Sequence, residues 1–275
     1  MTINCNGQLI DLSTPKVMGI VNITPNSFYD GGKLSDEKST LLQVEKMLSD
    51  GATFIDVGGY SSKPNAEFVS EEEELQRVIP IIQSMVKEFP KALLSIDTFR
   101  SQVAKHSVEN GVAIVNDISA GSLDENMMRT VAQLRVPYIM MHMKGTPKTM
   151  QSLAHYDDLV KEILFYFSEK IAQARSFGIS DVIVDPGFGF AKTLEQNFEL
   201  LNKLELFEML NLPLLVGVSR KSMIYKTLST DAEHALNGTT SLNTISLMKG
   251  AKILRVHDVK EAVECVQLYQ KLISK

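Results

Sequence analysis

The sequence predicts an α/β fold, a (β/α)8 barrel of the TIM type, from three observations. Short apolar, β-branched runs alternate with amphipathic segments along nearly the whole chain, which is typical of parallel strands covered by helices. About eight such units fit into roughly 250 residues, the usual size of this barrel. A polar residue directly follows most of the runs. An open, doubly wound sheet is the alternative, but the loop after the first strand, VNITPNSFYDGG, lacks the GxGxxG pattern typical of that fold.

Length and composition limit the class of protein. The chain has 275 residues, 44 % of them hydrophobic, and a net charge of −5, so we expect one domain over residues 1–275 that binds neither nucleic acid nor membrane. No apolar stretch is long enough to cross a bilayer, and no signal-peptide pattern is present. The two cysteines, Cys5 and Cys265, stand near opposite ends and argue against a disulfide framework, which indicates a cytoplasmic protein.

The N-terminal half begins with a predicted hairpin. Asn6-Gly7 lies between short apolar runs, which predicts a type I′ turn in residues 3–12 that closes one end of the core. Strands are expected at 17–21, 53–57, 93–96 and 113–115. One intervening helix is expected at 35–50, and a second begins at Ser70, which forms a capping box with Glu73. A third follows Asp97 and ends at Asn110, and a fourth is expected at 124–134.

The C-terminal half continues the alternation. Strands are expected at 138–141, 182–184, 214–218 and 252–256, and helices at 157–177 (the longest), 193–208, 232–249 and 258–273. The stretch 181–193, DVIVDPGFGFAKT, shows the unit most clearly, as an apolar strand that ends on Asp185 before a glycine loop. By itself this carboxylate fits a ligand site and a helix cap equally well.

Polar residues recur at the predicted strand ends. In a barrel these ends converge on one mouth. The residues there are Asn22, Asp56, Asp97, Asn116, Asp117, His142, Asp185, Ser219, Lys221, Arg255 and His257.

Two subsets of these residues suggest a ligand. Asp97, Asn116, Asp185 and Lys221 suit a flat heterocycle with several ring N–H and C=O groups. Arg255 and His257 suit a phosphate or pyrophosphate, and Asn22 offers a neutral oxygen for a Mg²⁺ ion that bridges to the anion.

Simpler interpretations remain for some of them. Asp56 and Asp117 could cap helices or pair with neighbours inside the mouth, and His142, flanked by methionines, fits a packed or hydrogen-bonded histidine better than a metal ligand. No zinc-ligand spacing and no Ser-His-Asp pattern is evident. Arg255 in an apolar strand, pointing the same way as His257, favours function.

Eight motifs, in order over essentially the whole chain, resemble the dihydropteroate synthase family. They are GIVNITPNSFYDGG (19–32), GATFIDVGGYSSKP (51–64), SIDTFR (95–100), NDISAG (116–121), MHMKGTPKTMQ (141–151), DPGFGFAKT (185–193), GVSRKS (217–222) and RVHDV (255–259). The resemblance implies that 4-aminobenzoate attacks the methylene carbon of 6-hydroxymethyl-7,8-dihydropterin pyrophosphate. Pyrophosphate leaves and 7,8-dihydropteroate forms, as a step of folate synthesis.

The resemblance also implies roles for individual residues, in a homodimer. Asp97, Lys221, Arg255 and His257 would be catalytic. The pterin would be held by Asp97, Asn116, Asp185, Lys221 and Arg255. The pyrophosphate would be held by Asn22, Ser62, Lys63, Arg255 and His257, with Mg²⁺ on Asn22. The aminobenzoate would be surrounded by Phe28, Ser62, Pro64, Phe190, Lys221 and Ser222, and the loops 24–32 and 61–68 would close over the site.

The reaction needs little acid–base chemistry. An aryl amine is already a neutral nucleophile, so the demand is for stabilisation of the leaving anion and of the positive charge that grows on the pterin methylene. We therefore expect a dissociative substitution, with the loops shielding the cation from water.

The sequence departs from the family pattern at six positions, one of which is Asn65 in place of a Gly. Tyr60, Ser62 and Lys63 stand where the family usually has Glu, Thr and Arg, Asn26 replaces an Asp, and Ala191 replaces a Gly. Lysine lacks the guanidinium fork, and serine lacks a methyl group beside the aminobenzoate site, so we expect lowered affinity for sulfonamides.

Two other functions compete. One is a methyltransferase that passes a methyl group from a reduced folate to a corrinoid protein, but the anion-binding residues and the TPNSFYDGG loop argue against it. The other is a non-catalytic paralogue that only binds pterin, which the loop departures leave open.

Overall fold

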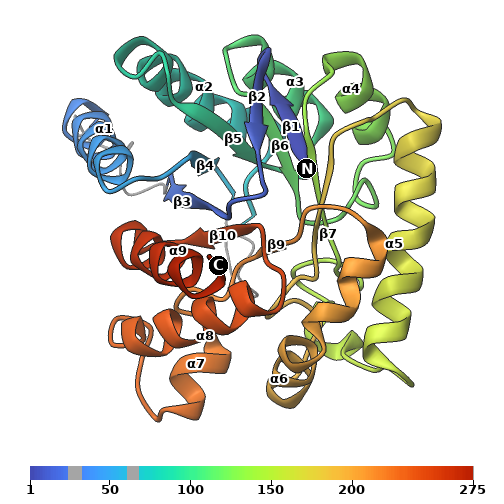
Figure 1. The fold of residues 1–275 in the computed structure, drawn as a ribbon. Helices are drawn as coiled ribbons and strands as arrows, with labels where there is room; N and C mark the ends of the chain where they lie inside the picture. Colours follow the sequence, from blue (N-terminus) through green and yellow to red (C-terminus); the bar gives the residue numbers. More distant parts are fainter. Residues whose placement is uncertain (24–32, 61–67, 275) are drawn as a thin grey trace.

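Eight parallel strands alternate with helices and form a nearly closed barrel with the helices outside (Figure 1). The computed structural model describes residues 1–23, 33–60 and 68–274. The hydrogen-bonded order of the strands is β8-β7-β6-β5-β4-β3-β10-β9. A parallel bridge between Val184 and Leu214 brings β8 alongside β9. The predicted barrel is confirmed, and the open doubly wound sheet is excluded.

All eight predicted barrel strands are present. They are β3 (Lys16–Asn22), β4 (Phe54–Gly58), β5 (Leu93–Asp97), β6 (Ile114–Asp117), β7 (Tyr138–Met141), β8 (Val182–Asp185), β9 (Leu215–Val216) and β10 (Ile253–Val256). β9 is shorter than the predicted 214–218. Leu214 forms only an isolated bridge with Val184, and after Val216 the chain enters a turn in which the carbonyl of Val218 accepts from the amide of Lys221.

The helices follow the prediction with several differences, one of which is an additional short helix at 222–227. They are α1 (Lys33–Ser49), α2 (Glu71–Glu88), α3 (Ser101–Glu109), α4 (Met127–Leu134), α5 (Leu159–Ser176), α6 (Leu194–Asn202), α7 (Ser222–Thr227), α8 (Leu236–Met248) and α9 (Val259–Ile273), with 3₁₀ turns η2 (Met150–Leu153) and η3 (Leu204–Leu210). The predicted helix 193–208 ends at Asn202 and continues as η3. The predicted region 232–249 becomes helical at Leu236. The helix expected to be longest, α5, has 18 residues, the same as α2.

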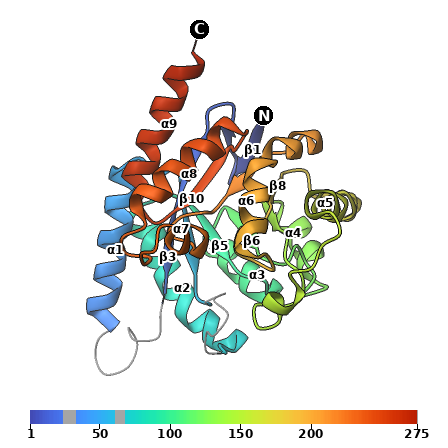
Figure 2. The same cartoon turned by 90° about the horizontal axis from the view of Figure 1, so that it is seen from below.

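The N-terminal hairpin closes one end of the barrel, as predicted. β1 (Thr2–Cys5) pairs with β2 (Gln8–Asp11), and Asn6 and Gly7 both have positive φ, as a type I′ turn requires. Ile3, Cys5 and Ile10 pack in one cluster with the first inward residues of the barrel strands. The hairpin crosses this end in Figure 1, and Figure 2 shows both chain termini on the same side of the molecule.

The barrel interior changes from apolar to polar along the same strands. Four alternate strands place a buried apolar residue in the cluster under the hairpin, namely Phe54, Ile114, Ile183 and Ile253. Two residues further along, where side chains return to the same side, stand Asp56, Asn116, Asp185 and Arg255. A barrel layer takes one side chain from each alternate strand. The second such layer is therefore entirely polar.

Candidate active site

Arg255 is the central cation of this polar layer. Its Nε donates to Asp56 Oδ2 at 2.6 Å, and its Nη2 donates to Asp97 Oδ2 at 2.7 Å. The guanidinium thereby joins β10 to β4 and β5. Its side chain keeps 20 % of its surface accessible, so one face remains available to a ligand.

Asp56 orients two neighbours with a single oxygen. The same Oδ2 also accepts from Asn116 Nδ2 at 2.9 Å, and Asp56 is fully buried. Because the amide nitrogen of Asn116 is engaged there, its carbonyl oxygen points away from Asp56. Asp56 Oδ1 has no hydrogen-bond partner among the described residues. The interpretation of Asp56 as a residue that pairs with neighbours inside the mouth is therefore confirmed.

Asp185 ends β8 and lies within electrostatic range of two cations. Its carboxylate accepts from the amide of Gly187 at 2.8 Å, and Lys221 and Arg255 both act on its pKa, which burial raises. The next helix, α6, is capped by Thr193. The helix-cap interpretation of Asp185 is therefore wrong, since another residue does that work.

Lys221 connects the loop after β9 to the loop after β8. Its ammonium donates to the carbonyl of Phe188 and lies 4.9 Å from the ring centroid of Phe190. Burial lowers the pKa of Lys221 to about 8, although the charge of Asp185 acts in the opposite direction. The group therefore remains mainly an ammonium at neutral pH and can donate hydrogen bonds to a polar heterocycle.

Asp97 is held against Arg255 in a desolvated position. Burial raises the pKa of Asp97 to about 7, while the Arg255 guanidinium opposes this rise and the negative charge of Asp56 adds to it. Asp97 can therefore carry a negative charge at neutral pH only because Arg255 is next to it.

The rim of the mouth carries His257 and Asn22. The amide of His257 donates to Ser219 Oγ at 3.2 Å, and the same hydroxyl lies 3.0 Å from His257 Nδ1. We assign the hydroxyl hydrogen to Nδ1, which places the ring proton on Nε2. Burial and the charge of Arg255 lower the pKa of His257 to about 4. His257 thus offers an anion a neutral N–H donor.

Asn22 and Asp97 stand on either side of Gly58. A Cβ atom added to Gly58 would lie 3.7 Å from Asn22 Oδ1 and 3.8 Å from Asp97 Oδ2. The described residues hold no group of three His, Cys, Asp or Glu that could bind a metal ion. Asn22 is therefore a single neutral oxygen donor at the rim.

Asp117 and His142 have structural partners. Asp117 accepts from Tyr138 Oη at 2.6 Å and from the amides of Ser119 and Gly121, so it shapes the loop after β6. His142 is 2 % exposed, and its Nδ1 lies 3.1 Å from Lys192 Nζ. The interpretation of Asp117 as a residue that pairs with neighbours and that of His142 as a hydrogen-bonded histidine are therefore confirmed.

Comparisons with known proteins agree with this geometry. The model of the family described as pterin binding enzyme matches residues 18–257. Dihydropteroate synthase of Escherichia coli K12 is 43 % identical over 276 residues, which cover 100 % of this chain and 97 % of that protein. The chain belongs to the dihydropteroate synthase family.

Solved structures of dihydropteroate synthases have the same fold. The Yersinia pestis enzyme in a sulfonamide drug complex has a TM-score of 0.93 and 40 % identity, and each chain covers 100 % of the other. The Xanthomonas albilineans enzyme in complex with 7,8-dihydropteroate has a TM-score of 0.89 and 34 % identity, again with 100 % of each chain covered.

Some expected dihydropteroate synthase residues lie outside the described part of the chain. They are Asn26, Phe28, Ser62, Lys63 and Pro64. The sequence analysis did not single out Lys192, which ends the glycine loop and contacts His142 and Gly187, although the motif DPGFGFAKT contains it. A charged residue inside an otherwise apolar, glycine-rich segment was the available signal.

Proposed function

We propose that this protein condenses 6-hydroxymethyl-7,8-dihydropterin pyrophosphate with 4-aminobenzoate to form 7,8-dihydropteroate and pyrophosphate. As a member of its family the chain is a transferase that acts on a pterin and an aminobenzoate. The observation that carries the proposal is the wholly polar layer at the mouth, in which Arg255 lies between Asp56 and Asp97. The relatives give no support to the competing methyltransferase.

The polar layer suits the edge of a pterin. A pterin ring presents N–H donors and acceptors in one plane. Carboxylate, amide and ammonium groups are offered by Asp97 on β5, Asn116 on β6, Asp185 on β8 and Lys221 in the loop after β9. The carbonyl that Asn116 turns away from Asp56 is an acceptor for such an edge. The guanidinium of Arg255 has an accessible face on which a flat ring can stack.

The rim suits the pyrophosphate. Arg255 supplies charge and His257 a neutral N–H, while Asn22 can share a Mg²⁺ with the anion, because this ion retains water ligands and needs few from the protein. Bound Mg²⁺ would neutralise charge on the leaving group. Lys63 and Ser62 are proposed to contact the same anion, and the loops 24–32 and 61–68 to close over it.

The residues act by charge placement. As the bond from the methylene carbon to the pyrophosphate oxygen lengthens, Arg255 stabilises the departing anion and Asp97 stabilises the positive charge on the pterin. The amine nitrogen of 4-aminobenzoate then bonds to the methylene carbon and loses a proton. Phe28, Pro64, Phe190, Lys221 and Ser222 are proposed to surround the aminobenzoate.

A single-turnover assay tests the function. The protein is mixed with the pterin pyrophosphate, Mg²⁺ and 4-aminobenzoate, and both pyrophosphate and dihydropteroate are quantified. One equivalent of each per site is expected. Pterin binding without release of pyrophosphate would support the non-catalytic paralogue, and methyl transfer from a reduced folate would support the methyltransferase.

A second experiment tests the dissociative order. Crystals soaked with the pterin pyrophosphate alone should show cleaved pyrophosphate before 4-aminobenzoate is added. An intact substrate, combined with isotope effects typical of a tight concerted step, would contradict this order.

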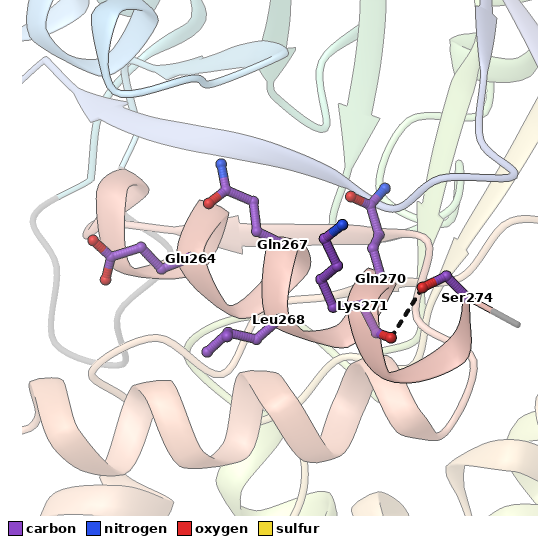
Figure 3. Close-up of a pocket in the computed structure, with 6 residues that line it drawn as sticks. All are labelled: Glu264, Gln267, Leu268, Gln270, Lys271 and Ser274. Atoms are coloured by element: carbon purple, nitrogen blue, oxygen red, sulfur yellow. Dashed lines mark hydrogen bonds between the residues drawn. The ribbon is translucent and has the colours of Figure 1, made fainter.

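The outer face of α8 and α9 is the proposed homodimer contact. Exposed apolar residues gather on these two packed helices, namely Ile245, Met248, Leu268, Leu272 and Ile273. Leu268 also lines a shallow pocket on α9 with Glu264, Gln267, Gln270, Lys271 and Ser274 (Figure 3). A second copy would cover this surface with the same surface of its own. Leu268→Asp/Leu272→Asp should sediment as a monomer, whereas Met209→Asp, on exposed η3, should leave the dimer intact.

The whole chain is proposed to form one domain in the cytoplasm. α9 packs against β3 and β10, so the last helix belongs to the same body as the first strand. Cys5 and Cys265 are both buried and free, which fits a reducing compartment. None of the described helices is long and apolar enough to cross a membrane.

A further inference from the structure

Lys192 is a buried cation that the proposed chemistry does not use. It is 3 % exposed, at the end of the loop between β8 and α6. Its ammonium contacts three acceptors, none of them a carboxylate. It lies 2.9 Å from the carbonyl oxygen of Gly187, 3.0 Å from that of Phe190 and 3.1 Å from His142 Nδ1.

This arrangement satisfies all three N–H donors of an ammonium group. His142 can accept because burial lowers its pKa well below the ordinary value, which keeps the ring neutral. Burial likewise lowers the pKa of Lys192 to about 7. Burial of an ammonium is unfavourable unless it is hydrogen-bonded, so these three contacts offset much of that cost.

The contacts of Lys192 organise the loop 186–191. Gly187 and Phe190 are the two ends of a turn in which the amide of Phe190 donates to the carbonyl of Gly187. Lys192 binds both of these carbonyls. Gly187 has φ +73°, and a Cβ atom there would lie 2.1 Å from the carbonyl oxygen of His142, so the turn sits directly on the chain after β7.

The same loop carries groups of the proposed aminobenzoate site. The ring of Phe190 lies beside the ammonium of Lys221, which donates to the carbonyl of Phe188. Gly189 packs against the Lys221 stem, at 3.4 Å from an added Cβ to Cδ. A shift of the turn would therefore move Phe190 and Lys221 together. Of the proposed pterin residues, Asp97, Asn116 and Arg255 have no hydrogen bond to Lys192 or to the turn among the described residues. Asp185 is joined to the turn through the amide of Gly187, a bond that does not involve Lys192.

We propose that Lys192 is a positioning residue for 4-aminobenzoate. It holds the turn between Gly187 and Phe190 so that the Phe190 ring and the Lys221 ammonium keep the spacing that the aromatic substrate requires. This inference rests on the proposed function and adds a determinant of its second substrate.

The test compares Lys192→Met with Lys170→Met. Methionine keeps the length and apolar bulk of the lysine stem but cannot bind the two carbonyls. Lys170 is a half-buried lysine on α5, 5.8 Å from the Tyr166 ring, and is a matched control outside the loop. For Lys192→Met we expect KM for 4-aminobenzoate to rise about tenfold while KM for the pterin pyrophosphate changes less than about twofold. Lys170→Met should leave both values unchanged.

A second variant keeps the test decisive if Lys192→Met does not fold. Tyr156 Oη donates to the carbonyl of Ala191 at 2.9 Å, so Tyr156→Phe removes one loop contact and keeps the ring. It should raise KM for 4-aminobenzoate about threefold, with the same selectivity. Hydrogen exchange of the peptide 186–191 should accelerate in both variants and not in Lys170→Met.

The outcomes separate the inference from the proposed function. Absence of turnover in the unmodified protein would overturn the function. Normal turnover with unchanged KM in Lys192→Met, or in Tyr156→Phe where the former does not fold, would overturn the inference. Equal increases in both KM values would also overturn it, because they indicate a general structural role.

Discussion

The same strands form both ends of the barrel, but the closed end is apolar and the mouth is polar and charged. On β8, Ile183 is fully buried under the hairpin, while Asp185, two residues later, faces the polar mouth. On β10, Ile253 and Arg255 have the same relation. The closed end gains stability from apolar burial, whereas the mouth holds charges whose burial is unfavourable unless they are paired. On these strands, the residue that stabilises the closed end and the residue that forms the proposed site are two positions apart.

The mouth should show the largest effect on activity. Arg255→Ala removes the cation between Asp56 and Asp97, so we expect kcat to fall by about 100-fold or more. The free energy of unfolding should also fall, by about 3 kcal/mol at neutral pH, because two buried carboxylates lose their partner. Turnover per folded molecule, measured with thermal unfolding, checks this. A variant that is unstable but equally active per folded molecule would exclude a catalytic role for Arg255.

The closed end should show a large effect on stability alone. Ile183→Ala opens a cavity beneath the hairpin and should lower the free energy of unfolding by about 2–5 kcal/mol. Because the mouth layer is untouched, kcat per folded molecule should stay within about twofold. Denaturant unfolding and active-site titration measure the two quantities. A parallel loss of kcat would show that the two ends are coupled.

Asp97 should make the free energy of unfolding of the protein depend on pH. Its pKa is raised in the folded protein to about 7, against an unfolded value near 3.9. The folded state therefore binds the proton more tightly, and this contribution is full below about pH 4 and is lost as the pH rises through 7.

Asp97→Asn removes this dependence. The free energy of unfolding of the variant, relative to the unmodified protein, should thus increase by about 2 kcal/mol between pH 5 and pH 8. Ile183→Ala serves as the control with no such slope. The same difference at both pH values would show that Asp97 titrates normally.

The smallest expected effect is on the affinity of the protein for sulfonamides. The double variant Ser62→Thr/Lys63→Arg restores the usual family residues, and its sulfonamide inhibition constant should be about threefold lower than that of the unmodified protein. Parallel inhibition assays against 4-aminobenzoate check this, and equal constants would reject the idea. Both residues lie outside the described part of the chain.

Much of the fold could be predicted because strand and helix periodicities are local. Apolar runs that end on Asp97, Asn116 and Asp185, and the run interrupted by Arg255, located these strands to within about a residue or two. The alternation of side chains then placed these residues at one end of a barrel. The shortness of β9 was not predictable from its apolar run, because the strand is cut short by the turn that the amide of Lys221 closes on the carbonyl of Val218.

The rest of the site depends on contacts between distant segments. Nothing local shows that Asp56 Oδ2 joins Asn116 to Arg255, which are separated by more than a hundred residues along the chain. Nor does the sequence show that Lys192 reaches His142, 50 positions away. Such pairs follow from the barrel closure and from loop shape, and the pKa values of these groups follow from the pairs.

The position of the termini has a practical consequence. The hairpin places the N-terminus at the closed end, and α9 runs back from β10 so that the C-terminus projects on that same side (Figure 2). An affinity tag, a fluorophore or a solid support attached at either terminus would therefore stand away from substrate entry. An immobilised enzyme or a biosensor could be made without blocking the mouth.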